Sequence, residues 1–222
     1  MSVDNRRPIK ARGNRWASAT AARLAQAGVL PNQISIASMG FALLAGFCFW
    51  VGLGYAQELG QRVLLVLGAL CIQARLLCNL FDGMVAVEGG MKTPGGAVYN
   101  ELPDRVADTL ILLGLGYGLS AWPWAAHLGW AAALLAMATA YVRVLGGSCG
   151  LPQKFLGPMA KPQRMAVLTG AALIGACLPT LWAQWLMLTA LALIALGSAW
   201  TAWRRTDCRI PRSKPGLLES SD

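Results

Sequence analysis

Six carboxylate and amide side chains stand close together in a sequence that is otherwise strongly apolar. They are Asn79, Asp82, Asn100, Glu101, Asp104 and Asp108. Ionisable side chains next to hydrocarbon are costly unless they pair, bind a cation or line a wet cavity, so they indicate a functional site. A single histidine and six scattered cysteines argue against a histidine or thiolate metal site. Oxygen ligands of this kind suit a hard divalent cation, and we expect Mg²⁺ or Mn²⁺.

The spacing of these residues predicts two polar stripes on consecutive helices. A helix advances by about 100° per residue, so residues three or four apart share a face. The first stripe consists of Arg75, Asn79, Asp82 and Ala86, and the second of Gly96, Asn100, Asp104 and Asp108. Small residues would let the two helices approach each other. We therefore predict one site between them, with Glu101 beside the second stripe.

The composition indicates an integral membrane protein. Of the 222 residues, 56% are hydrophobic and only 13% are charged, whereas a soluble domain has about 25% charged residues. We predict an all-α integral membrane fold with six transmembrane helices, each near the length that a bilayer core requires. The predicted spans are residues 33–55, 62–88, 96–119, 123–146, 164–183 and 185–203. A short interfacial amphipathic helix is expected before them, between residues 14 and 30.

Three regions follow from this pattern. Residues 1–32 form a basic cytoplasmic and juxtamembrane segment, and residues 33–205 form the six-helix membrane domain. Residues 206–222, with prolines and mixed charge, are expected to be a disordered cytoplasmic tail. Pro103 interrupts the third predicted span, and Pro179 helps to end the fifth.

The net charge of +9 is concentrated beside the predicted spans, which argues against nucleic acid as a partner. Six basic residues precede the first span and five follow the last one. The loops and helix ends on the same side carry Lys92, Arg143, Lys154, Lys161 and Arg164, whereas the opposite loops carry Arg62 alone. An excess of Lys and Arg marks the cytoplasmic side of a membrane protein. We therefore expect both termini and the polar site to face the cytoplasm, in the cell's inner (cytoplasmic) membrane.

The two polar stretches resemble the signature of the CDP-alcohol phosphatidyltransferases, D-x-x-D-G-x-x-A-R-x8-G-x3-D-x3-D. The residues that match it without a gap are Asp82, Gly83, Ala86, Gly96 and Asp104. Asn79 and Asn100 stand where the signature has Asp, and Val87 replaces its Arg. Two further elements also resemble the family: Pro31-Asn32 followed by Ser35, and the run from Lys161 to Arg164. The resemblance covers roughly residues 30–205.

The resemblance implies an enzyme that moves a phosphatidyl or other substituted phosphate group from a CDP-linked donor such as CDP-diacylglycerol to a polar alcohol. CMP is released, and such enzymes are usually homodimers. Asp104 would be the general base. The implied metal site consists of Asn79, Asp82, Asn100 and Asp104, with Glu101 and Asp108 as substitutes for the missing carboxylates. The implied nucleotide site lies near Asn32, Arg75, Gly83, Ala86 and Gly96. Acceptor or phosphate binding would fall to Lys92, Arg143, Lys161 and Arg164.

Other interpretations remain open at this point. The acids and amides could hold the helices together without doing chemistry, as polar side chains often do in membranes. The two Asn residues in the signature are also consistent with an inactive or regulatory paralogue that binds cytidine nucleotide. A cation channel or transporter is a third alternative, although the acids gather near one face instead of along the full membrane depth. The sequence does not identify the acceptor alcohol.

Overall fold

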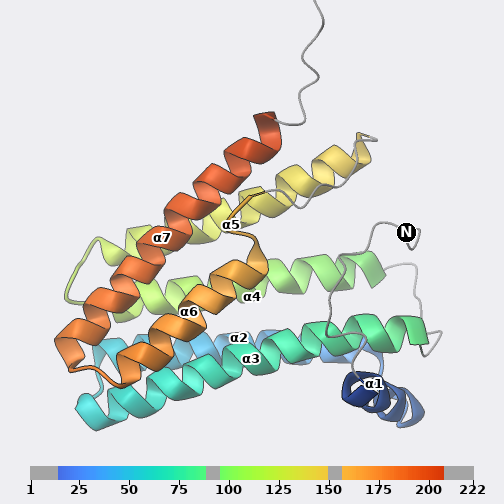
Figure 1. The fold of residues 1–222 in the computed structure, drawn as a ribbon, viewed down its shortest axis with the longest axis horizontal. Helices are drawn as coiled ribbons and strands as arrows, with labels where there is room; N and C mark the ends of the chain where they lie inside the picture. The colour runs from blue at the N-terminus through green and yellow to red at the C-terminus, as the bar shows by residue number, and fades with distance from the viewer. Residues whose placement is uncertain (1–14, 89–95, 150–156, 208–222) are drawn as a thin grey trace, which may run out of the picture.

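The protein folds as an assembly of α-helices, as the sequence predicts. The structure, a computed structural model, describes residues 15–88, 96–149 and 157–207, without the side chains of residues 88, 97, 99 and 100. All regular elements in these ranges are helices (Figure 1): α1 (Arg15–Gln26), α2 (Pro31–Gly54), α3 (Glu58–Glu88), α4 (Gly96–Gly118), α5 (Ala125–Ser148), α6 (Lys161–Ala176) and α7 (Thr180–Asp207). The predicted disordered tail lies almost entirely outside the described residues.

Helices α2 to α7 correspond in order to the six predicted spans. Four of them, α2, α3, α5 and α7, are long and apolar enough to cross a membrane. Of the other two, α4 carries charged residues in its first half, and α6 has only 16 residues. The predicted boundary between the last two spans was placed too late, because α6 ends at Ala176 and α7 begins at Thr180. Pro179 explains this, since proline disfavours helical geometry in the residue before it and suits the start of the next helix.

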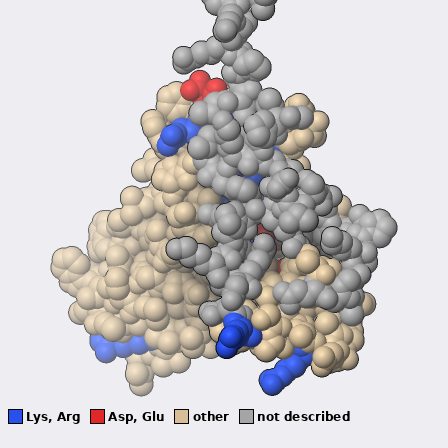
Figure 2. All heavy atoms as spheres, turned by 45° about the vertical axis from the view of Figure 1, so that its right-hand side comes forward, with Lys and Arg blue, Asp and Glu red and all other residues tan. Residues whose placement is uncertain are grey.

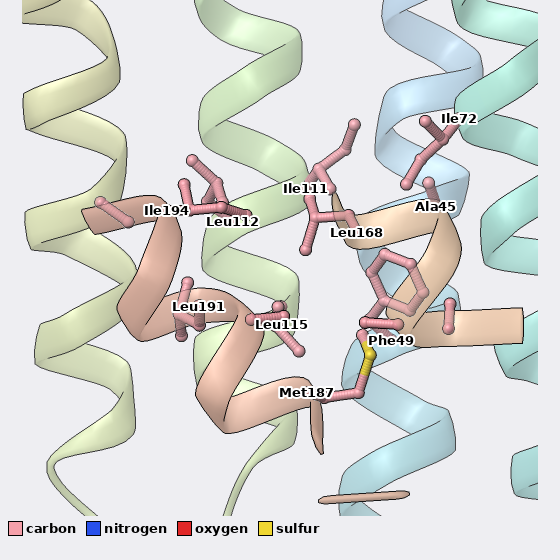
Figure 3. Close-up of a cluster of buried hydrophobic side chains, with 14 of the residues drawn as sticks. Ala45, Phe49, Ile72, Ile111, Leu112, Leu115, Leu168, Met187, Leu191 and Ile194 are labelled. Atoms are coloured by element: carbon pink, nitrogen blue, oxygen red, sulfur yellow. The ribbon is translucent and has the colours of Figure 1, made fainter. Parts of the chain in front are cut away.

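Helices α2 to α7 pack as a ring in the spatial order α2, α3, α6, α7, α5 and α4, and α4 also contacts α7. Side chains from five of them meet in the interior (Figure 3), where Phe49, Ile72, Ile111, Leu168 and Met187 are fully buried. The C-terminal end of α3 and the N-terminal ends of α4 and α6 lie toward the same end of the molecule (Figure 1). The predicted polar stripes are therefore at one end of the ring, beyond this apolar core.

Glycines allow α2 and α4 to pack with their backbones in contact. A Cβ atom added at Gly114 would lie 2.2 Å from the carbonyl oxygen of Gly46, and one at Gly118 would lie 2.4 Å from the carbonyl oxygen of Phe49. No side chain fits at such distances, and small residues are the usual means of close helix packing in membranes. This contact determines how far α4 can approach α2, and so where the acidic half of α4 lies.

The outside of the ring is apolar, as expected for a surface that faces lipid. Its exposed side chains include Leu43, Phe47, Leu70, Leu134, Leu193 and Leu196. Figure 2 shows a broad uncharged flank, with the visible Lys and Arg side chains near its margins. Helix α1 crosses the end of α2 and α3 (Figure 1) and buries Ala17 and Ala21 in a small cluster with Met84. This position fits the short amphipathic helix that was predicted before the first span.

Candidate functional site

The two polar stripes predicted from helical spacing do face each other. Asn79 on α3 donates from Nδ2 to Oδ1 of Asp104 on α4, at 2.9 Å. One turn away along both helices, Nη2 of Arg75 donates to Oδ1 of Asp108 at 2.6 Å. The four-residue spacing within each helix thus produces two polar clusters between α3 and α4. We call them the open cluster (Asn79, Asp82, Asp104 and Lys161) and the closed cluster (Arg75, Asp108 and Arg164).

Asp82 of the open cluster is buried, with only one of its carboxylate oxygens paired. Its Oδ2 accepts a hydrogen bond of 2.7 Å from the hydroxyl of Ser35, at the start of α2. Its Oδ1 is buried and has no hydrogen-bond partner among the described residues. Buried oxygens without a partner are rare and call for an explanation such as a bound ion or water. Ser35 was not among the predicted site residues, although it belongs to the family-like element that begins at Pro31.

Asp104 lies at the centre of the open cluster. Its Oδ1 accepts hydrogen bonds from Asn79 and from the ammonium group of Lys161, the first residue of α6. Nη2 of Arg75 is 3.7 Å from the same oxygen. No described residue donates a hydrogen bond to Oδ2 of Asp104. One oxygen therefore fixes the orientation of the carboxylate, and the other remains for a ligand.

These residues fit a divalent cation in the chemistry of their donors. The unpartnered Oδ1 of Asp82 is a hard oxygen ligand, and carboxylate and amide oxygens are the ligands that Mg²⁺ and Mn²⁺ prefer. The described residues include no group of three or more Asp, Glu, His or Cys side chains arranged to hold a metal ion. One reason is that an amide replaces a carboxylate at Asn79. The Asn100 side chain lies outside the described residues.

In the closed cluster both oxygens of the carboxylate are paired, whereas Nε of Arg75 and Nε of Arg164 are buried without a hydrogen-bond partner among the described residues. The two oxygens of Asp108 accept hydrogen bonds from Arg75 at 2.6 Å and from Arg164 of α6 at 2.7 Å. Arg164 also donates to the carbonyl oxygen of Met159 at 2.9 Å, and all three charged side chains are buried. A buried ion pair offsets its cost of desolvation only with good geometry and further hydrogen bonds, which this cluster has. Asp108 therefore ties α3, α4 and α6 together.

Glu101 lies on another side of α4 and pairs with two arginines. Its Oε2 accepts a hydrogen bond of 2.9 Å from Arg105, and its Oε1 accepts one from Arg143 of α5. The Glu101 side chain is 38% exposed, so this group is at the rim of the structure. Glu101 thus connects α4 to α5 in the described structure.

The residues predicted to bind nucleotide lie on three helices. Gly83 is buried next to Asp82 on α3, and Ala86 is partly buried one turn further on. Asn32 is partly buried in the first turn of α2, and Gly96 begins α4. Arg75 belongs to the closed cluster, which lies nearer the N-terminal end of α3 than Gly83 and Ala86 do. Lys92, predicted to bind phosphate, lies outside the described residues.

Comparisons with known proteins support the sequence-based resemblance, although no family model matches the chain. The protein is 28% identical over 189 residues to the inner membrane protein YnbA of Escherichia coli, covering 82% of this chain and 83% of that protein. It is 27% identical over 217 residues to the phosphatidylinositol phosphate synthase of Mycobacteroides abscessus, covering 90% of this chain and 84% of that enzyme.

The solved structures of a third protein show the same fold. The phosphatidylinositol phosphate synthase of Mycobacterium tuberculosis with CDP-DAG bound superimposes with a TM-score of 0.73 at 20% identity, covering 94% of this chain and 100% of that one. The structure of that enzyme with manganese and citrate also gives a TM-score of 0.73, at 19% identity, covering 93% of both chains. The protein therefore shares its helical fold with phosphatidylinositol phosphate synthases.

Proposed function

We propose that this protein is a phospholipid-synthesis enzyme that transfers a phosphatidyl group from a CDP-activated lipid, such as CDP-diacylglycerol, to a polar alcohol and releases CMP. The observation that carries the proposal is the contact between Asn79 and Asp104, with the half-paired Asp82 beside them. The fold adds support, because the similar enzyme of Mycobacterium tuberculosis binds CDP-DAG. The phosphatidylinositol phosphate synthases among the relatives point to the same reaction class.

The proposal places the protein in the inner membrane, with helices α2 to α7 crossing it and α1 lying on its surface. The polar clusters and both termini would face the cytoplasm, on the side where the basic residues gather. The inner membrane relative from Escherichia coli supports this location. A donor with two acyl chains could then stay in the bilayer while its nucleotide reached the site. We expect the enzyme to act as a homodimer.

We assign metal binding to the oxygens of Asp82, Asn79 and Asn100, next to Asp104. A bound Mg²⁺ or Mn²⁺ would neutralise charge on the donor's diphosphate, which is the main electrostatic demand of phosphoryl transfer. The cytidine would lie near Asn32, Gly83, Ala86 and Gly96, at the helix ends next to this site. The closed cluster would hold α3, α4 and α6 in position, so we give Asp108 a positioning role.

Asp104 is proposed as the general base. The acceptor's hydroxyl oxygen would attack the β-phosphorus of the donor, and the bond from that phosphorus to the oxygen of CMP would break. Oδ2 of Asp104 would take the hydroxyl proton as the new bond forms. The hydrogen bonds of Asn79 and Lys161 to Oδ1 orient the carboxylate for this step.

The basic residues favour an acceptor that itself carries phosphate. Two of the predicted phosphate ligands are partly exposed: Arg143, which is 18% exposed beside Glu101, and Lys161, which is 19% exposed beside Asp104. Arg164 is buried against Asp108 and would act indirectly. Inositol phosphate is an acceptor of this class, in agreement with the names of the similar enzymes.

The test is release of CMP by the purified protein in nanodiscs with CDP-diacylglycerol and Mn²⁺. The acceptors would be inositol phosphate, glycerol phosphate, free inositol and serine. We expect CMP release and a new phospholipid with one of the phosphorylated acceptors. Release with the neutral alcohols alone would contradict the acceptor assignment. No release with any acceptor would contradict the proposed function.

A further inference from the structure

Lys161 places a positive charge inside the proposed metal site. Its ammonium group contacts Oδ1 of Asp104, and the lysine side chain is only 19% exposed. Its position is held by the backbone, because α6 begins at Lys161 and is anchored one turn later by the buried pair of Arg164 and Asp108. The ammonium is therefore a built part of the open cluster and does not belong to a flexible surface side chain.

The net charge of the open cluster favours the binding of one divalent cation over two. Its formal charges are two negative, from Asp82 and Asp104, and one positive, from Lys161, while Asn79 is neutral. One divalent cation would bring the total to about +1, whereas two would bring it to about +3 beside the buried closed cluster. Positive charges close together in a largely dry site repel each other strongly. The described cluster contains no further negative side chain that would offset the total of about +3 left by two cations.

The oxygens lead to the same conclusion as the charges. Oδ1 of Asp104 already accepts two hydrogen bonds, from Asn79 and Lys161, so only Oδ2 remains for a metal ion and the carboxylate does not offer one oxygen to each of two metal ions. Oδ1 of Asp82, by contrast, has no partner and is suited to a single cation. The amide of Asn79 donates to Asp104 through its nitrogen, which leaves its oxygen as a further ligand for the same cation.

We infer that the ammonium group of Lys161 takes the place of a second divalent cation, so that the site binds one Mn²⁺ per chain. This inference rests on the proposed function, because it concerns the charge that the same site offers to a diphosphate. Lys161 would supply a permanent positive charge beside Asp104, and the single metal would be held on the side of Asp82.

The test counts the Mn²⁺ ions bound to the purified protein in nanodiscs by electron paramagnetic resonance, without any substrate. We expect one Mn²⁺ per chain in the wild type, with the spectrum of an isolated ion. Lys161→Met removes the charge at similar length and should either admit a second Mn²⁺ or raise the affinity about tenfold. Lys161→Gln keeps a hydrogen-bond donor toward Asp104 and should behave in the same way, because charge is the quantity that matters.

Two control variants make the result specific. Lys161→Arg keeps the positive charge and should bind one Mn²⁺ like the wild type. Arg105→Met removes a cation that contacts Glu101, so its Mn²⁺ binding should be unchanged. Melting temperatures of all variants in the same nanodiscs would show that they are folded. The number of Mn²⁺ ions bound per wild-type chain is a test that does not depend on the folding of any variant.

Two Mn²⁺ per wild-type chain, with the coupled spectrum of a pair of ions about 4 Å apart, would overturn the inference. Unchanged Mn²⁺ binding in both Lys161→Met and Lys161→Gln would overturn it as well. CMP release, measured on the same preparation, separates this failure from that of the proposed function. An active wild type with two Mn²⁺ would refute the inference alone, whereas a wild type with neither CMP release nor bound Mn²⁺ would refute both.

Discussion

The open and closed clusters lie one helical turn apart between α3 and α4, and they differ in how completely their carboxylates are paired. In the closed cluster, each oxygen of Asp108 accepts a hydrogen bond from a buried arginine. In the open cluster, Oδ1 of Asp82 has no partner among the described residues, and Oδ2 of Asp104 receives no hydrogen bond from them. Polar residues one helical turn apart on the same two helices thus form two different environments.

This difference separates a scaffold from a reactive site. A carboxylate with both oxygens bound to guanidinium groups cannot accept a proton or a metal without losing those bonds. A carboxylate with one oxygen held and the other available is oriented and still able to react. The closed cluster therefore explains why the helices stay in position, and the open cluster is where we expect the chemistry.

The largest effect is expected from Asp104→Asn in the open cluster. The amide oxygen can still accept the hydrogen bonds from Asn79 and Lys161, but the proton acceptor is lost. Turnover should fall by about 10²–10⁴, the usual contribution of a general base, with little change in melting temperature or in binding of the CDP-lipid. Rates of CMP release and lipid binding, measured on the same preparation, would check this. A fully active Asp104→Asn would show that the open cluster does not supply the base.

Asp108→Asn should act on stability, because it breaks the closed cluster. An amide offers one oxygen, so its nitrogen would face one of the two arginines, donor against donor. Removing one partner of a buried charged group costs about 3–5 kcal/mol, which we expect as the loss in free energy of unfolding in detergent. The matched control is Glu58→Gln, which breaks the exposed pair with Arg62 and should cost about 1 kcal/mol or less. Equal stability of the two variants would remove the distinction between the clusters.

Asn79→Asp tests whether the open cluster is an active variant of the signature site or an inactive site that has lost its carboxylates. A carboxylate at position 79 cannot donate to Oδ1 of Asp104 and would place a like charge beside it. We expect CMP release to fall about tenfold, the equivalent of one pKa unit of unfavourable interaction. A large gain in activity would instead favour the inactive-paralogue interpretation, in which the Asn residues mark decay. Asn100→Asp, assayed alongside, would extend the test to the second departure from the signature.

The sequence predicted the relations within each helix better than those between helices. The four-residue spacing was sufficient to place Asn79 and Asp104 on facing stripes, because helical geometry relates such positions directly. The pairing of Asp108 with Arg164 joins residues 56 positions apart, and that of Ser35 with Asp82 joins residues 47 apart. Such pairs depend on how the helices rotate and pack, which no local pattern records. The sequence therefore suggested Asp108 as a metal ligand, whereas the structure surrounds it with arginines.

Helix ends show the same limit. A hydrophobic run of about twenty residues predicted a fifth span as far as residue 183, but α6 stops at Ala176. Hydropathy continues through the turn at Pro179 without a change, because the residues on both sides are apolar. The backbone restriction that proline imposes on its neighbour was the better signal for this boundary.

The smallest effect is expected from Glu101→Gln. Glu101 is partly exposed and joins α4 to α5, on another side of α4 from the two clusters. The substitution weakens pairs with Arg105 and Arg143, which are partly exposed, so the free energy of unfolding should fall by about 1 kcal/mol or less. The Mn²⁺ concentration for half-maximal rate should not change if Glu101 only joins α4 to α5. If Glu101 instead replaces the carboxylate missing at position 100, the variant should resemble Asp82→Asn, for which that concentration should rise about tenfold or more. Titrating both variants with Mn²⁺ in one assay decides between a rim residue and a metal ligand.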